Sequence, residues 1–199
     1  MKSGRIIFFI ALLAAAFWLY RINYWKIVDY QNIKLPVKNG GKISADLYAV
    51  NNPKGWILLT HSMPETKKSW KNLANRMRDL GYESLAIDLR GHGESDGGPN
   101  GYDKFSKEEH QAGIDDLGAA WDYLKSRGAL PQKTVAIGGS IGANLSLLFL
   151  TEYPEISGGV LLSAGDYQGI NSADLVKKLD ANQKLLLVAS KLDERTAGN

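Results

Sequence analysis

The five residues Gly138-Gly139-Ser140-Ile141-Gly142 carry the strongest chemical signal in the sequence. They follow an apolar run, Thr134–Ile137, and precede another, Ala143–Leu150, as a turn between a strand and a helix would. A serine on such a turn stands in strained backbone with its hydroxyl exposed, and small residues two positions before and after it let neighbouring backbone pass. The N–H groups of the following helix then favour a developing negative charge. The pattern predicts Ser140 as a nucleophile, and the alternative is a glycine-rich turn that binds phosphate or only packs.

Several strands must position this turn. Two alternating stretches, around 32–37 and 42–50, predict an antiparallel hairpin across Asn39-Gly40-Gly41. Continuous apolar runs, typical of strands buried on both faces of a parallel sheet, occur at Trp56–Thr60, Glu83–Leu89, Thr134–Ile137, Gly159–Ser163 and Leu185–Ala189.

Helical patterns lie between these runs. Apolar residues at helical spacing from Trp70 to Leu80 predict a helix that Gly81 ends. A capping box at Ser106 and Glu109 predicts the start of a helix that ends near Gly128, and a short helix is expected over 172–179. Strands alternating with helices indicate the α/β class with a doubly wound, mostly parallel sheet, whose ligands bind at the carboxyl ends of the strands.

From about residue 30 to its end, the chain resembles the α/β-hydrolase family. Besides the Ser140 turn, the segment His61-Ser62-Met63-Pro64 matches the family's His-Gly oxyanion loop, with Ser62 where glycine is usual. The segment 88–95 (DLRGHGES) resembles the family's Asp-x-Arg-Gly-His-Gly-x-Ser turn. The resemblance implies that Gly138 and Gly142 shape the nucleophile turn, that the N–H groups of Met63 and Ile141 hold the oxyanion, and that the 88–95 turn, including His92, is structural.

The resemblance also places a carboxylate late in the chain, where it orients a histidine base. Asp193, after the run Leu185–Ala189, is the preferred acid, and Asp166 is its competitor. No histidine follows Asp193, because the three in the chain are His61, His92 and His110. We therefore expect a fragment, truncated at its C-terminus and inactive by itself, whose domain 29–199 is incomplete.

The predicted function is hydrolysis of carboxylic esters, or of thioesters or amides, through a Ser140 acyl-enzyme. A serine nucleophile argues against the dehalogenase, epoxide hydrolase and dienelactone hydrolase branches of the resembling family. Only about twenty residues separate the last two predicted strands, too few for a helical cap, which favours an open esterase site. The alternative is a non-catalytic binding protein on the same scaffold. No cofactor or metal is predicted, because no histidine has a second ligand at metal spacing.

Charge and composition limit the classes of molecule that the protein is expected to bind. The 199 residues are 44% hydrophobic and 23% charged, with a net charge of +3 and no cysteine. Residues 1–28 hold four basic residues and no acid, so the remainder is close to neutral. A near-neutral body without a Lys/Arg cluster lacks the electrostatic footprint of a nucleic-acid-binding protein. A small-molecule ester or acyl compound is the expected substrate.

The N-terminus, residues 1–28, is predicted to be a signal anchor or signal peptide. The run Ile6–Tyr20 is apolar or aromatic over 15 residues and is flanked by basic residues. It is short for a span of about 20 residues, and Ala14 and Ala16 offer a cleavage pattern. An uncleaved hydrophobic helix is preferred, and a core helix of the domain is the alternative. The protein is expected to be membrane-anchored or exported, with the side of the membrane left open.

Overall fold

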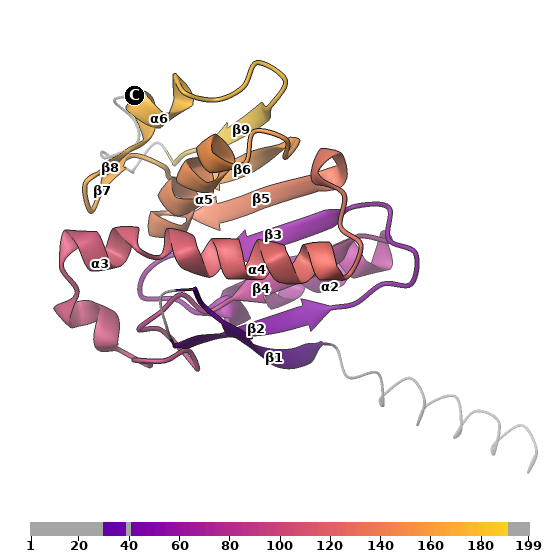
Figure 1. Cartoon of the computed structure of the whole chain (residues 1–199), viewed down its shortest axis with the longest axis horizontal. Helices are drawn as coiled ribbons and strands as arrows, with labels where there is room; N and C mark the ends of the chain where they lie inside the picture. Colours follow the sequence, from indigo (N-terminus) through magenta and orange to yellow (C-terminus); the bar gives the residue numbers. More distant parts are fainter. Residues whose placement is uncertain (1–29, 39–40, 191–199) are drawn as a thin grey trace, which may run out of the picture.

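The computed structural model describes residues 30–38 and 41–190. The predicted N-terminal segment, part of the predicted hairpin turn (Asn39 and Gly40) and Asp193 lie outside the described residues. The described chain forms a seven-stranded sheet with the order β1-β2-β4-β3-β5-β6-β9 (Figure 1). Its strands are β1 Gln31–Pro36, β2 Lys42–Tyr48, β3 Trp56–Thr60, β4 Glu83–Ile87, β5 Thr134–Gly139, β6 Gly158–Leu162 and β9 Lys184–Val188.

Strand directions follow the predicted division into a hairpin and a parallel sheet. β1 and β2 pair antiparallel, and β2 also pairs antiparallel with β4. β4, β3, β5, β6 and β9 pair parallel with their neighbours. The carboxyl ends of these five strands therefore share one edge, and Ser140 directly follows the central strand β5. The predicted doubly wound, mostly parallel sheet is confirmed.

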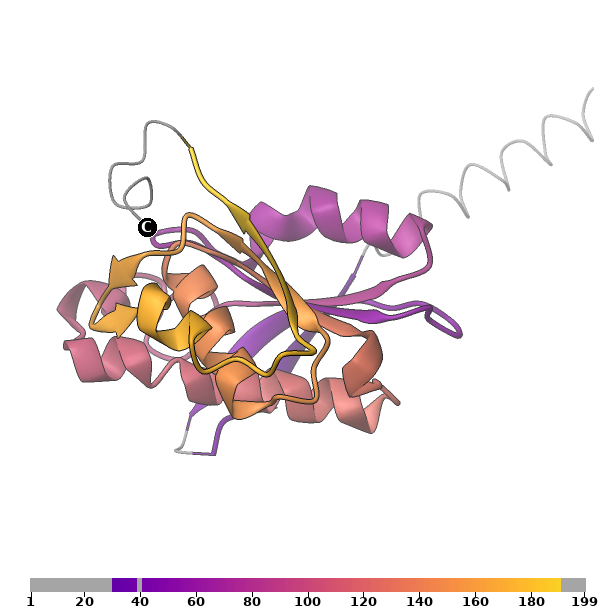
Figure 2. The same cartoon turned by 90° about the horizontal axis from the view of Figure 1, so that it is seen from above.

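Helices cover both faces of the sheet (Figure 2). The 3₁₀ turn Lys67–Trp70 and helix α2, Lys71–Asp79, pack on one face, against an apolar cluster that includes Leu59. The other face is covered by α4, Ile114–Ser126, and α5, Ile141–Glu152, which enclose the larger core with Trp121 and Phe149 fully buried. Around β5, the face under α4 and α5 is therefore buried, whereas Val135 and Ile137 on the face that carries α2 are only partly buried.

Two predicted elements differ in the structure. The helix expected from the capping box to Gly128 is two helices, because the chain turns at Gly113 between α3, Lys107–Gln111, and α4. A Cβ on Gly113 would lie 2.9 Å from a methyl group of Leu145, so the turn packs closely on α5. The predicted short helix is α6, Ser172–Val176, and the sequence did not predict the small hairpin of β7, Asp166–Tyr167, and β8, Ile170–Asn171, that precedes it.

The last strand also departs from expectation. The run Leu185–Ala189 was expected to be a buried strand, but Leu186 and Leu187 of β9 are 58% and 61% exposed. The reason is position: β9 pairs with β6 alone and is the edge strand of the sheet among the described residues. An apolar run therefore predicted the strand correctly and its burial wrongly.

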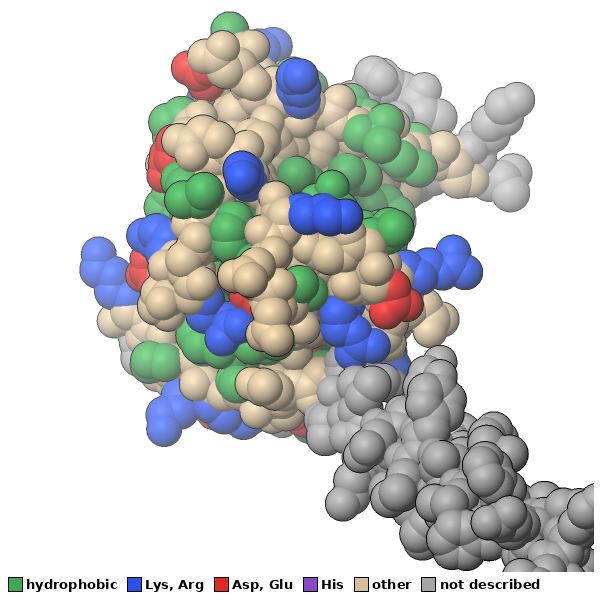
Figure 3. All heavy atoms as spheres, turned by 90° about the vertical axis from the view of Figure 1, so that its right-hand side faces the viewer, with side chains coloured by type: hydrophobic (Ala, Val, Ile, Leu, Met, Phe, Trp, Pro, Cys, Tyr) green, Lys and Arg blue, Asp and Glu red, His purple; other side chains and the backbone are tan. Residues whose placement is uncertain are grey.

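On the face in Figure 3, Lys and Arg side chains outnumber Asp and Glu side chains, but hydrophobic and other residues separate them. Among residues 30–38 and 41–190, no helix combines the length and the apolar composition needed to cross a bilayer.

Candidate active site

Ser140 occupies the sharp turn predicted for it. The residue has φ 50° and ψ −118°, a backbone conformation that side-chain-bearing residues seldom adopt, and it precedes the first turn of α5. Its own N–H donates to Leu162 O of β6 at 2.8 Å, and its carbonyl accepts from the N–H groups of Ala143 and Asn144. The strained residue is held by the sheet on one side and by the helix on the other, so its hydroxyl has a fixed position at the carboxyl end of β5.

Gly138 and Gly142 allow this turn to close. A Cβ on Gly138 would lie 2.1 Å from Gly142 O, and a Cβ on Gly142 would lie 2.4 Å from His61 O. These are backbone atoms that cannot move aside, so a side chain at either position would force the strand, the turn and the loop after β3 apart. Both glycines are therefore needed for the close approach of these backbone segments.

The two predicted oxyanion donors lie on either side of the turn. Ile141 is the first residue of α5, and Met63 belongs to the loop after β3. Ser62, the neighbour of Met63 in this loop, lies against Gly139. In the described part of the chain, neither N–H is taken by a backbone or side-chain acceptor. Met63 lines the cavity described below and Ile141 does not, and the first N–H groups of a helix, such as that of Ile141, favour an anion.

A cavity of about 480 Å³ opens at this point. It brings the nucleophile turn together with the loop after β3, the 3₁₀ turn that follows it, and the end of β6. The residues that line it are Ser62, Met63, Glu65, Ser69, Trp70, Gly139, Ser140, Leu162 and Ser163. A substrate carbonyl placed here would meet Ser140 and the Met63 side of the oxyanion site.

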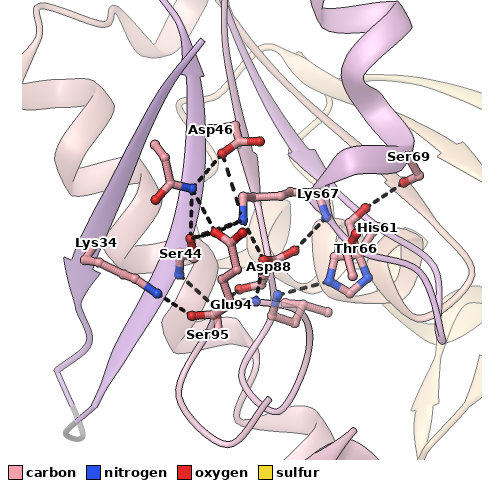
Figure 4. A network of polar contacts seen from close by, with 12 residues as sticks. Lys34, Ser44, Asp46, His61, Thr66, Lys67, Ser69, Asp88, Glu94 and Ser95 are labelled. Atoms are coloured by element: carbon pink, nitrogen blue, oxygen red, sulfur yellow. Dashed lines mark hydrogen bonds and ion pairs between the residues drawn. The ribbon is translucent and has the colours of Figure 1, made fainter. Parts of the chain in front are cut away.

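The loop from His61 to Lys67 is fixed at both ends to the turn after β4 (Figure 4). At its start, His61 Nε2 accepts the N–H of Leu89 at 3.1 Å. At its end, Lys67 donates its backbone N–H to Asp88 Oδ1 at 2.7 Å and its ammonium to Asp88 Oδ2 at 2.8 Å. Met63 lies between these two anchors, so the segment 88–95 fixes the loop that carries Met63 without lining the cavity.

Lys67 is the centre of a buried charge network. Its side chain is 1% exposed, and its ammonium also contacts Glu94 at 2.9 Å, Ser44 at 3.1 Å and Asp46 at 3.9 Å. Burial by itself would lower the pKa of Lys67, but the hydrogen bonds with Asp88 and Glu94 outweigh it and raise that pKa above its usual value. The same contact with Lys67 lowers the pKa of Glu94, whereas burial raises the pKa of Asp46.

None of the three histidines lines the cavity that holds Ser140. Both ring nitrogens of His61 are occupied, since Nδ1 lies 2.9 Å from Ser62 O while Nε2 accepts from Leu89, and burial lowers its pKa to about 4. His92 stacks on Tyr102 with ring centroids 4.0 Å apart, which agrees with its predicted structural role. His110 is buried in α3, and burial lowers its pKa too.

The two candidate acids are placed differently. Asp166, the competitor, is an exposed residue of the β7–β8 hairpin and does not line the Ser140 cavity. Asp193 lies outside the described residues, and its role stays a prediction. β9, which precedes Asp193, runs parallel to β6 and ends at the same edge of the sheet as Ser140.

Sequence reasoning missed two residues near the site. Lys67 sits in the polar stretch Glu65–Ser69, which reads as solvent-exposed, and no periodicity there signals a buried ammonium. Ser163 lines the cavity with φ 54°, and it follows β6 as Ser140 follows β5. The sequence predicted Ser163 as the last residue of the strand Gly159–Ser163, and this place at a strand end was the only signal that could have marked it.

Comparison with known proteins agrees with this geometry. The family described as serine aminopeptidase, S33, matches residues 51–195. No curated protein matches the chain significantly. Many solved structures are similar, among them an esterase of Pyrococcus furiosus, with 22% identity and a TM-score of 0.63 over 79% of this chain and 68% of that one.

Two further structures share the fold at lower coverage. An epoxide hydrolase of Vigna radiata has 23% identity and a TM-score of 0.56, over 70% of this chain and 42% of that one. The α/β-hydrolase GrgF from Penicillium sp. sh18 has 16% identity and a TM-score of 0.58, over 67% of this chain and 45% of that one. The chain thus spans less than half the length of these two relatives.

Proposed function

This chain belongs to the serine aminopeptidase S33 family of α/β-hydrolases, and from that premise we propose that it cleaves carboxylic esters through an acyl-enzyme on Ser140. Family membership supports hydrolase chemistry, and the strained turn of Ser140 beside a cavity carries the assignment of the nucleophile. Thioesters and amides are substrates of the same chemistry.

In the proposed reaction, Ser140 Oγ attacks the carbonyl carbon of the ester while a base accepts the hydroxyl proton. The carbonyl oxygen becomes an oxyanion, held by the N–H groups of Met63 and Ile141. Collapse of this intermediate breaks the bond to the alcohol, which leaves with the proton. Water then attacks the acyl-enzyme by the same route, releasing the acid and restoring Ser140.

The proposed acid is Asp193, which would orient the base. None of the three histidines is placed to act as that base, since His61 and His92 are engaged with the backbone and His110 lies in α3. This observation favours the second candidate function, a binding protein that keeps the scaffold without turnover. The two candidates differ in one measurable property, the reactivity of Ser140.

Labelling with a fluorophosphonate tests the proposal. We expect the protein expressed from its complete coding sequence to label, and Ser140→Ala to abolish labelling. Ser126→Ala is a matched control, because its exposed hydroxyl donates to Tyr123 O at the end of α4. Absence of labelling where a known serine hydrolase reacts would refute the esterase proposal and favour the binding protein.

A pair of aspartate variants tests the acid. Asp193→Asn should lower turnover of a small ester by about 10⁴-fold, the effect of losing the carboxylate that fixes the base's tautomer. Asp166→Asn should change turnover little, because that side chain is exposed and away from the cavity. The reverse ranking would contradict the assignment.

The substrate proposal rests on the openness of the site. The segment between β6 and β9 forms only the β7–β8 hairpin and α6, without a helical cap. Soluble or short acyl esters should therefore be preferred, and a series of p-nitrophenyl esters of increasing chain length measures this directly.

We also propose that residues 6–20 attach the protein to a membrane or direct its export. Full-length protein should sediment with membranes, and deletion of residues 1–24 should release it. Recovery of the full-length protein in the soluble fraction would contradict attachment.

A further inference from the structure

Ser62 is one of the polar residues that line the cavity and that the proposed mechanism leaves unused. It immediately precedes Met63 and lines the same cavity as Ser140. Its carbonyl contacts the His61 ring, but its hydroxyl has no hydrogen-bond partner within residues 30–38 and 41–190. The cavity hydroxyl of Ser69 differs, because it donates to Thr66 O at 2.9 Å.

The position of the Ser62 hydroxyl depends on Gly139. A Cβ on Gly139 would lie 2.4 Å from Ser62 Oγ, which is closer than two such atoms can approach. The hydroxyl therefore fills the space that a side chain directly before the nucleophile would occupy. A serine at 62 and a bare Cα at 139 fit together, and the result is a hydroxyl group beside Ser140.

We propose that Ser62 Oγ–H is a third hydrogen-bond donor to the oxyanion, beside the N–H groups of Met63 and Ile141. This assignment rests on the proposed acyl transfer at Ser140. A hydroxyl bonds more strongly to a charged oxyanion than to a neutral carbonyl, so the contact stabilises the transition state more than the bound substrate. Its loss should therefore lower kcat and leave KM nearly unchanged.

Substitutions at Ser62 test the donor. In the protein expressed from its complete coding sequence, Ser62→Ala and Ser62→Gly should lower kcat for p-nitrophenyl acetate by about 10- to 100-fold, the range for a hydrogen bond to a charged group. Ser62→Thr should retain most of the activity, because it keeps the hydroxyl. Affinity for a trifluoromethyl ketone, whose Ser140 adduct carries an oxyanion, should fall by the same factor as kcat.

Substitutions at Gly139 distinguish a Ser62 hydroxyl that takes part in catalysis from one that only fills space. Gly139→Ala should displace the hydroxyl and lower kcat as Ser62→Ala does, and the double variant Ser62→Gly/Gly139→Ala should be no worse than either single variant. If the double variant regains wild-type kcat, Ser62 serves packing alone and the proposal is overturned.

Two further outcomes distinguish failure of the Ser62 assignment from failure of the proposed function. A kcat for Ser62→Ala equal to that of the remote control Ser126→Ala, with Ser140 still labelling, overturns the Ser62 assignment and leaves the proposed function intact. Absence of Ser140-dependent labelling in the wild-type protein overturns the proposed function and this inference with it.

Discussion

Replacing Lys67 with methionine should destabilise the protein by about 3–5 kcal/mol at neutral pH, the usual effect of deleting one partner of a buried ion pair. Lys67 and Asp88 are each 1% exposed, and their charged atoms lie 2.8 Å apart. At that distance the attraction is about 6 kcal/mol for an effective dielectric constant near 20. Desolvation of the ammonium offsets part of this attraction. Removing the ammonium, however, leaves the carboxylates of Asp46 and Asp88 buried without a counter-charge. Glu94 contributes less, because its side chain is 50% exposed.

The effect of Lys67→Met on stability should depend on pH in a defined direction. Lys67 lowers the pKa of Glu94, so this contact stabilises the fold above the usual glutamate pKa of 4.5 and is lost as the pH falls below it. Lys67 itself has a raised pKa, so its contribution is complete below its usual value of 10.5 and is lost at higher pH. The difference in unfolding free energy between wild type and Lys67→Met should therefore be largest between these limits and shrink in acid.

Urea unfolding followed by tryptophan fluorescence measures this difference, with the buried Trp121 as a reporter. Lys68→Met is the matched control: the neighbouring residue is exposed, and its loss should change stability by less than about 0.5 kcal/mol. Equal stability of the two variants, or a difference that grows in acid, would refute the reasoning. Because Lys67 anchors the loop that carries Met63, the variant should also lose turnover.

Three further predictions concern the elements around the site. His61 should titrate near pH 4 by NMR, since burial lowers its pKa from 6.5. Because the unfolded chain binds this proton at a higher pH than the folded chain does, the His61 contribution to the unfolding free energy should fall by about 3 kcal/mol as the pH drops from 6.5 to 4. Asn144→Ala should lower the unfolding free energy by about 3 kcal/mol or more, because the buried amide donates to Gly165 O and Ile170 O, and Asn182→Ala on the surface is its control. Gly142→Ala should lower the melting temperature and abolish Ser140 labelling, because its methyl group would meet backbone oxygens 2.4 and 2.5 Å away.

Local chemistry explains which parts of the fold could be predicted. The Ser106–Glu109 capping box forms as expected, with the Glu109 N–H donating to Ser106 Oγ at 3.2 Å, because both partners lie within one turn of the chain. The strand before Ser140 and the helix after it were likewise predictable, since apolar runs and glycines act over a few residues. The break at Gly113 was not, because it depends on packing against Leu145, a contact made far along the sequence.

The same distinction applies to the site. Ser140 and its flanking glycines are one local motif, so their arrangement could be predicted. Lys67, in contrast, owes its burial to carboxylates on two separate strand regions, Asp46 of β2 and Asp88 after β4. A lysine in a polar stretch carries no mark of such partners, and only the sheet order β2-β4-β3 brings them together.

The loop after β3 links these observations into one account of the site. Its anchors, His61 and Lys67, both bind the turn after β4, and neither lines the cavity. His61 accepts the Leu89 N–H only while Nε2 is unprotonated, and its low pKa keeps it so at neutral pH. The same contact prevents His61 from acting as a base, because accepting a proton at Nε2 would break the bond that holds the loop. In the proposed mechanism, His61 would therefore serve by staying neutral and holding in place the loop that carries the proposed oxyanion donor Met63.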